Sequence, residues 1–154
     1  MSLKTIIGPM RKVMACLQKN CKKEIQKTME LRTKAIEPIM AMLEKAKKDH
    51  LEGKITEQQY IKIVKTVSKK LLETYDKLDK SQEVLSMYVC SATKCQKEHI
   101  QNLKSLLRFQ ETSCKKGQKK MCEMAKHTSA ILKNNSITSE QLQSYTKKER
   151  MLYS

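Results

Sequence analysis

The longest stretch of the chain without glycine or proline contains residues 56–109, which read TEQQYIKIVKTVSKKLLETYDKLDKSQEVLSMYVCSATKCQKEHIQNLKSLLRF. Apolar residues recur there at every seventh position, with His99 as a polar member of the series. Such a repeat is typical of a helix that packs lengthwise against another helix. We expect one helix over residues 57–113, about 85 Å long at about 1.5 Å per residue, which the polar Thr74, Ser81 and Asn102 could bend or split. The predicted helix-interface residues are Val64, Leu71, Leu78, Leu85, Ala92 and Leu106.

Three further helices flank this stretch in the prediction. Steps of three and four between apolar residues predict a helix over residues 10–50, opened by Gly8-Pro9 and kinked near Pro38. Gly53 and Gly117 are expected to reverse the chain. Shorter helices are predicted over residues 118–133 and 139–152, and the second follows a capping box like the one that begins at Thr56. The expected fold is all-α: a single domain over residues 1–154, built as an elongated antiparallel helical hairpin or bundle with one very long central helix and two shorter C-terminal helices.

The charge of the chain is strongly positive and is carried by lysine. Twenty-eight lysines and four arginines face sixteen acidic residues, for a formal net charge of +16. A chain that is basic throughout is expected to meet a polyanion, an anionic membrane surface or an acidic protein face. Because lysine acts as a point charge, nucleic-acid binding would use the phosphate backbone with little sequence preference. The predicted basic surface is formed by Lys22, Lys23, Lys47, Lys48, Lys69, Lys70, Lys115, Lys116, Lys119 and Lys120.

Four of the six cysteines form two Cys-x4-Cys pairs whose spacing suggests a hairpin. Cys16 with Cys95, and Cys21 with Cys90, share one midpoint that lies in the turn predicted after Gly53. The arrangement is similar to the disulfide-stapled helical hairpins of mitochondrial intermembrane-space proteins, which use gaps of three or nine residues. Residues five apart on a helix point about 140° away from each other, so we expect at most one of the two bridges. The preferred interpretation is six free thiols in a reducing compartment.

Histidine and cysteine residues are the candidates for a metal site or a catalytic site. Cys95 and His99 lie one helical turn apart, and Cys114 and Cys122 could complete a set of metal ligands, but the Cys-x2-Cys knuckle of structural zinc sites is absent. No cysteine–histidine pair has an orienting third group, and three isolated glycines cannot form a phosphate-binding loop. We therefore expect no metal, no cofactor, no small-molecule substrate and no enzymatic activity.

A short internal repeat relates the two cysteine pairs. Cys16-Leu-Gln-Lys-Asn-Cys21-Lys-Lys-Glu resembles Cys90-Ser-Ala-Thr-Lys-Cys95-Gln-Lys-Glu, at an offset of 74 residues. Ile55-Thr56-Glu-Gln-Gln similarly resembles Ile137-Thr138-Ser-Glu-Gln. A duplicated helix-turn-helix unit and chance similarity between lysine-rich helices both account for these matches.

One segment resembles a known family. Residues 115–126, KKGQKKMCEMAK, resemble the hairpin turn of ESCRT-III membrane-remodelling proteins, which are basic helical hairpins that polymerise on anionic membranes. The match covers only this segment, and the acidic C-terminal half typical of that family is missing. We interpret it as convergence between basic hairpins.

The function expected from these features is that of a non-enzymatic structural or assembly protein. It would pair with itself or bind a larger acidic or multi-protein partner, as a component of a shell or virion does. Sequence-nonspecific nucleic-acid binding and peripheral binding to anionic membranes are the alternatives. No run of apolar residues is long enough to cross a membrane and no secretory signal is visible, so an intracellular, non-secreted protein is expected.

Overall fold

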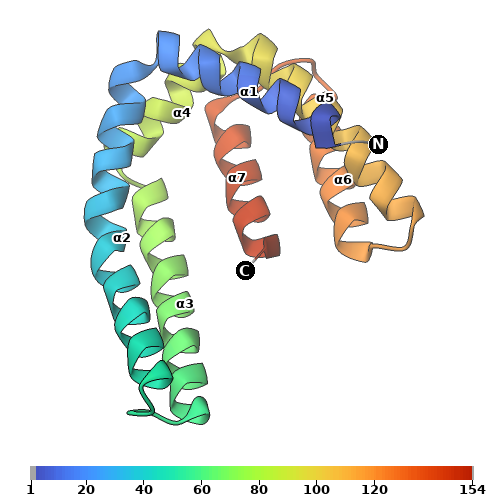
Figure 1. Ribbon diagram of the computed structural model, residues 1–154. Helices are drawn as coiled ribbons and strands as arrows, with labels where there is room; N and C mark the ends of the chain where they lie inside the picture. The colour runs from blue at the N-terminus through green and yellow to red at the C-terminus, as the bar shows by residue number, and fades with distance from the viewer. Residues whose placement is uncertain (1–2, 154) are drawn as a thin grey trace. The chain divides into compact units, whose positions relative to one another are not determined.

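The computed structural model describes residues 3–153, which contain seven α-helices and no strand. The helices are α1 (Leu3–Asn20), α2 (Lys22–Leu51), α3 (Glu57–Asp79), α4 (Gln82–Lys94), α5 (Gln96–Lys115), α6 (Lys119–Leu132) and α7 (Ser139–Tyr153), drawn in Figure 1. The all-α prediction is confirmed. Residues 26–84 form one compact unit, and the segments before and after them together form a second.

The single helix predicted over residues 57–113 is not present, because the helix is interrupted twice within that range. At the first break, Ser81 N and Ser81 Oγ both donate to the carbonyl of Leu78, which an uninterrupted helix would bond to residue 82. This competition by a serine side chain ends α3. The second break is at Cys95, between α4 and α5.

The predicted helix over residues 10–50 differs in a similar way. Helix α1 begins at Leu3, so Pro9 lies inside it and does not open it. Helix α2 continues through Pro38, and the chain is interrupted instead at Cys21, between α1 and α2, where no interruption was predicted.

The turns and caps agree with the sequence prediction. Gly53 and Gly117 have φ angles of 75° and 96°, in the left-handed region that only glycine adopts at little cost. At Thr56 the capping box is complete: Gln59 N donates to Thr56 Oγ1 at 3.1 Å, and Thr56 N donates to Gln59 Oε1 at 2.8 Å. The same reciprocal pair joins Thr138 and Gln141.

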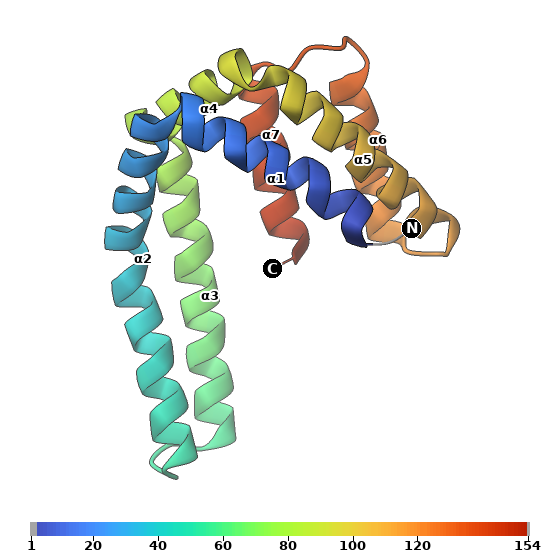
Figure 2. The same cartoon turned by 45° about the horizontal axis from the view of Figure 1, so that its top comes forward.

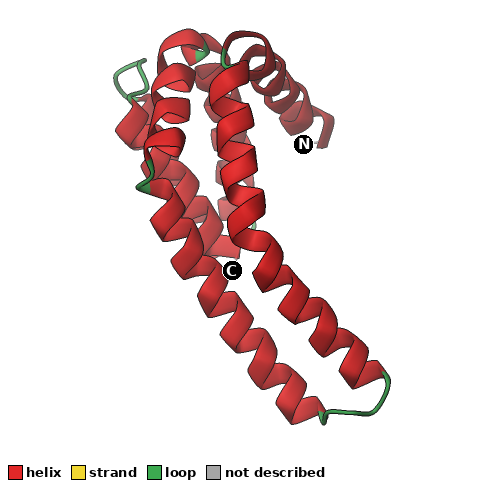
Figure 3. Ribbon diagram, turned by 90° about the vertical axis from the view of Figure 1, so that its left-hand side faces the viewer, coloured by secondary structure: helices red, strands yellow, loops and turns green. Residues whose placement is uncertain are grey.

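The unit formed by residues 26–84 is an antiparallel pair of helices. Figures 1 and 3 show α2 and α3 side by side, joined by the short loop that follows Leu51. The buried residues of α2 within this unit are Thr28, Ile39 and Ala46, at intervals that return to one helix face. At the loop end, the rings of His50 and Tyr60 stack with centroids 4.9 Å apart.

The second unit is built around α5. Helix α1 packs along α5, α6 folds back on α5 after the turn at Gly117, and α7 contacts α6 (Figure 2). A buried hydrogen bond of 2.8 Å from Thr128 Oγ1 to Gln110 Oε1 joins α6 to α5. The core of this unit includes Val13, Leu103, Met124, Ile131, Leu142 and Tyr145.

Candidate functional site

Two disulfides tie the region around the α1–α2 break to the region around the α4–α5 break. They join Cys16 to Cys95 and Cys21 to Cys90, each with Cα atoms 6.0 Å apart. The third disulfide joins Cys114 to Cys122, and no cysteine is free. The interpretation of six free thiols is therefore wrong, and so is the expectation that at most one of the two Cys-x4-Cys bridges forms.

The two helix breaks explain why both bridges form. On a regular helix the two side chains of a Cys-x4-Cys pair would diverge, and only one bridge could form. Cys21 lies between α1 and α2, and Cys95 between α4 and α5, so one member of each pair is outside regular helical geometry. The chains also approach more closely than the 8–10 Å of ordinary helix packing, because the Cα separation of 6.0 Å is within the range for disulfides.

The surroundings of the two bridges repeat under an approximate two-fold relation. Cys16 Sγ lies 3.7 Å from the carbonyl oxygen of Lys94, and Cys90 Sγ lies 3.7 Å from that of Asn20. The two breaks also share a pattern of backbone hydrogen bonds, from Ile25 N to the Cys21 carbonyl and from His99 N to the Cys95 carbonyl, both 3.0 Å. The offset of 74 residues between the two Cys-x4-Cys segments is therefore also a correspondence in space.

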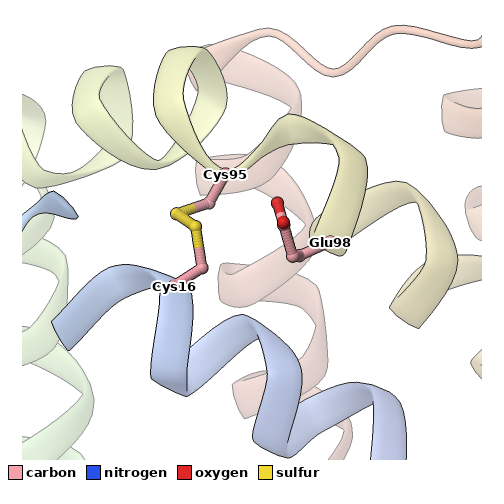
Figure 4. A group of neighbouring side chains, drawn as sticks. All are labelled: Cys16, Cys95 and Glu98. Carbon is pink, nitrogen blue, oxygen red and sulfur yellow. A yellow bond between two sulfur atoms is a disulfide. The ribbon is translucent and has the colours of Figure 1, made fainter. Parts of the chain in front are cut away.

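Each bridge has a carboxylate beside it, which the sequence analysis did not select. A carboxylate oxygen of Glu98 lies within 4.8 Å of both sulfurs of Cys16–Cys95 (Figure 4). A carboxylate oxygen of Glu24 lies within the same distance of both sulfurs of Cys21–Cys90. The available signal was a Cys-x2-Glu sequence that occurs at both Cys21 and Cys95. In the oxidised protein the sulfurs are bonded to each other and offer no thiolate to a metal.

The four residues weighed as candidate metal ligands, Cys95, His99, Cys114 and Cys122, are not brought together as one set. Cys95 is bonded to Cys16, and Cys114 to Cys122. His99 forms no three-residue group of ligand atoms with any of them among residues 3–153. It is a core residue of α5, where burial lowers the pKa of its imidazole and the nearby Glu98 opposes that shift more weakly.

The residues predicted to form one helix interface lie on three different helices. Val64, Leu71 and Leu78 are on α3, Leu85 and Ala92 on α4, and Leu106 on α5. Leu78 and Ala92 are buried, whereas Leu85 is 36% exposed. The interruptions between helices therefore divide the seven-residue repeat among α3, α4 and α5.

The predicted basic residues are all on the surface. All ten paired lysines are exposed. Within the described part of the chain, ion pairs to a carboxylate are formed by Lys54 and Lys80, and none of the ten takes part in one. Their charge is therefore available to another molecule.

Four of these lysines share one small ring. Residues 114–122 read CKKGQKKMC, and the disulfide between the two ends closes a loop that contains Lys115, Lys116, Lys119 and Lys120. Cys114 lies in the last turn of α5, Cys122 lies in the first turn of α6, and both are half-buried. Within this segment, called the lysine loop below, residues 115–120 hold four lysines in six positions, the densest positive charge in the sequence.

An open hollow of about 770 Å³ lies between α5 and α6. Small side chains of α6 line it, with Glu111 on α5, Lys126 on α6 and Lys133 directly after α6. Its polar groups do not include a nucleophile paired with a base.

Comparison with known proteins identifies no relative: no protein-family profile, no curated protein and no solved structure matches this chain. Among residues 3–153, no helix combines the length and the apolar character needed to cross a membrane.

Proposed function

We propose that this chain is a non-enzymatic structural or assembly protein that acts in oxidising surroundings and joins a larger acidic or multi-protein complex, such as a shell or virion. The observation that carries the proposal is the set of ten exposed lysines without carboxylate partners, in a chain that is crosslinked by three disulfides. Disulfides persist in oxidising environments, so the three bridges support such a compartment or folding pathway.

The crosslinks support a structural role. Cys16–Cys95 and Cys21–Cys90 join segments that are 79 and 69 residues apart in sequence. A chain with one Phe and no Trp has little aromatic surface to bury, and disulfides supply the stability that such a core lacks. Stability gained in this way suits a component that must keep its shape inside a larger assembly.

Exposed apolar side chains supply a second kind of contact. Ile7, Met10 and Met14 lie at steps of three and four on α1, and each is at least 39% exposed. Methionine adapts its shape to a protein partner at little cost. This stripe favours protein association over contact with charged phosphates alone.

Nucleic-acid binding is the second candidate, and the unpaired lysines favour it. Phosphate neutralisation needs only accessible ammonium groups, which the ten lysines provide. Four arginines, one Phe and no Trp leave few side chains for base stacking or groove insertion.

One experiment with three arms separates these functions. The oxidised protein is titrated with a random-sequence DNA duplex over a salt series, mixed with anionic and with neutral vesicles, and sedimented alone over a concentration series. The proposal expects concentration-dependent self-association, with binding to DNA and vesicles no stronger than that of an arginine-free, lysine-rich helical peptide of matched charge density. A salt slope that corresponds to on the order of six phosphate contacts, with affinity retained near physiological salt, would overturn it in favour of nucleic-acid binding. Selective binding to anionic vesicles would overturn it in favour of a membrane role.

A further inference from the structure

The three disulfides differ sharply in accessibility. Cys21 and Cys95 are 0% exposed, and Cys90 is 7% exposed, so each of the two long-range bridges has at least one sulfur sealed from solvent. Both sulfurs of Cys114–Cys122 belong to half-buried residues at a surface turn. A thiol in solution must reach a sulfur along the S–S axis. Cys16 is half-buried as well, so Cys114–Cys122 is distinguished by having neither of its two cysteines buried.

The charges around the three disulfides differ in sign. A carboxylate lies within 4.8 Å of both sulfurs in each long-range bridge, from Glu98 in one and Glu24 in the other. No carboxylate of the described residues completes such a group at Cys114–Cys122. There the ring itself carries four exposed lysines and no acid, and the nearest acids in sequence on either side are the exposed Glu111 and Glu123. Positive charge attracts an incoming thiolate and stabilises the thiolate that leaves, whereas a carboxylate opposes both.

We propose that Cys114–Cys122 is a thiol–disulfide exchange site for anionic low-molecular-weight thiols, with the lysine loop as the element that selects their charge. The thiolate of the small molecule attacks Cys114 Sγ, the S–S bond breaks, and its electron pair leaves on Cys122 as a thiolate. The product is a mixed disulfide on Cys114. A second small thiol attacks the sulfur of the first and releases it as a symmetrical disulfide. The proton of that second thiol goes to Cys114, the Cys122 thiolate takes a proton from water, and both cysteines become thiols.

The direction of attack follows from the two helix ends. Cys122 is the fourth residue of α6, near the positive end of that helix, which stabilises a thiolate. Cys114 is the next-to-last residue of α5, near the negative end of that helix, which does not stabilise a thiolate. The better leaving group is therefore Cys122, and the mixed disulfide forms on Cys114.

The fold is arranged to survive this reaction. The turn keeps backbone hydrogen bonds from Gly117 N to the Cys114 carbonyl at 3.0 Å and from Gln118 N to the Ser113 carbonyl at 3.2 Å. The buried bond between Thr128 and Gln110 also holds α6 on α5 without help from the disulfide. Opening the loop therefore frees the lysines from the ring and leaves the helices paired.

The test uses the full oxidised chain and three small thiols of different charge: 2-mercaptoethanesulfonate, 2-mercaptoethanol and cysteamine. Rates are normalised to thiolate concentration, the reaction is quenched with acid, free thiols are alkylated, and tryptic peptides are analysed by mass spectrometry. Cys114 and Cys122 fall in different tryptic peptides, residues 109–115 and 121–126, so the modified sulfur is identified directly. The anionic thiol is expected to react fastest, the neutral thiol next and the cationic thiol slowest. The rates should span roughly tenfold at low salt, and the span should shrink as salt is added.

Two variants make the test specific. Replacing Lys115, Lys116, Lys119 and Lys120 by Gln should remove the dependence on thiol charge. The same replacement at Lys47, Lys48, Lys69 and Lys70, which removes equal charge from α2 and α3, should leave it intact. First modification at Cys122 or at a cysteine of the long-range bridges would overturn the proposal. The proposal would also be overturned if neither salt nor the lysine-loop variant changed the order of the three thiols. The salt series tests this on the unmodified protein.

Discussion

Ser105 Oγ donates a hydrogen bond of 2.6 Å to the carbonyl oxygen of Thr5, four residues before Pro9. In an α-helix that carbonyl accepts from the N–H at position 9, which proline lacks. A hydroxyl from α5 thus takes the place of the missing donor and joins α1 to α5 at the same point. This contact accounts for a helix that starts at Leu3 and tolerates an internal proline.

Replacing Ser105 by Ala should destabilise the protein by about 1 kcal/mol, because the carbonyl of Thr5 loses this donor. In a Pro9→Ala background the N–H at position 9 is restored, and the same serine replacement should cost clearly less. Urea unfolding of the four proteins of this double-mutant cycle measures the difference. Equal costs in both backgrounds would show that Ser105 does not substitute for the proline. Ser129→Ala on α6, at an exposed serine, serves as the surface control.

The two long-range disulfides are nested, so their contributions to stability should not add. With one bridge in place, the other closes only the short segments between the cysteines of each pair. Chain entropy then gives roughly 2–3 kcal/mol for the loss of either bridge, but roughly 7 kcal/mol for the loss of both. Denaturation of oxidised Cys16→Ser/Cys95→Ser, of Cys21→Ser/Cys90→Ser and of the fourfold variant tests this. If the variant with all four cysteines replaced loses only as much stability as the two double variants together, the nested topology is contradicted.

The buried pair Gln110 and Thr128 should be sensitive to removal of one partner alone. Thr128→Val keeps the shape of the side chain but leaves Gln110 Oε1 buried without its donor, at a cost of about 1–3 kcal/mol. Thr128→Ser keeps the hydroxyl and should cost less. Adding Gln110→Leu to Thr128→Val should recover part of the loss, because no polar group then remains unpaired. Thermal unfolding of the set decides, and a Thr128→Ser variant as unstable as Thr128→Val would rule out the hydrogen bond as the cause.

Stability should fall as the pH drops through the histidine range. Burial lowers the pKa of His99 below its ordinary value of 6.5, so below that value the unfolded chain binds a proton that the folded chain resists. His127 acts in the same direction, because burial and then the charge of Lys148 lower its pKa. Urea midpoints at about pH 7.5 and about pH 5.5 should therefore differ less in His99→Leu than in the unmodified protein. An unchanged difference would exclude His99 as a source of the pH dependence.

Glu149 should make stability fall with rising pH, opposite to the effect of the histidines, and should do so at lower pH. Burial raises the pKa of its carboxyl above 4.5, so the folded chain holds a proton that the unfolded chain releases as the pH rises through that value. Its contribution to stability is therefore lost with rising pH. Glu149→Gln should flatten this part of the profile, measured as urea midpoints in acidic buffers, while leaving the histidine-dependent part in place. A variant whose profile matches the unmodified protein throughout would contradict the assignment.

Features encoded within a few neighbouring residues could be predicted from the sequence. The capping boxes at Thr56 and Thr138 and the chain reversals at Gly53 and Gly117 depend on local hydrogen bonds and local φ angles, and each occurs where expected. The shared midpoint of the two cysteine pairs, which lies in the turn after Gly53, also followed from spacing alone. These features follow from the backbone chemistry of short segments, which distant parts of the chain hardly change.

The breaks at Cys21 and Cys95 were decided by the tertiary structure. A seven-residue repeat records which residues are apolar, but it does not record whether the helix that carries them is continuous. The helix stops where two segments far apart in sequence approach to a Cα separation of 6.0 Å, and the two crosslinks form there. The start of α1 depends on Ser105 in the same way, because the donor that replaces the missing N–H of Pro9 lies 100 residues away from Thr5. The sequence by itself therefore determined the caps, the turns and the spacing that pairs Cys16 with Cys95 and Cys21 with Cys90, whereas long-range contacts determined that the helices break at Cys21 and Cys95 and that both crosslinks form.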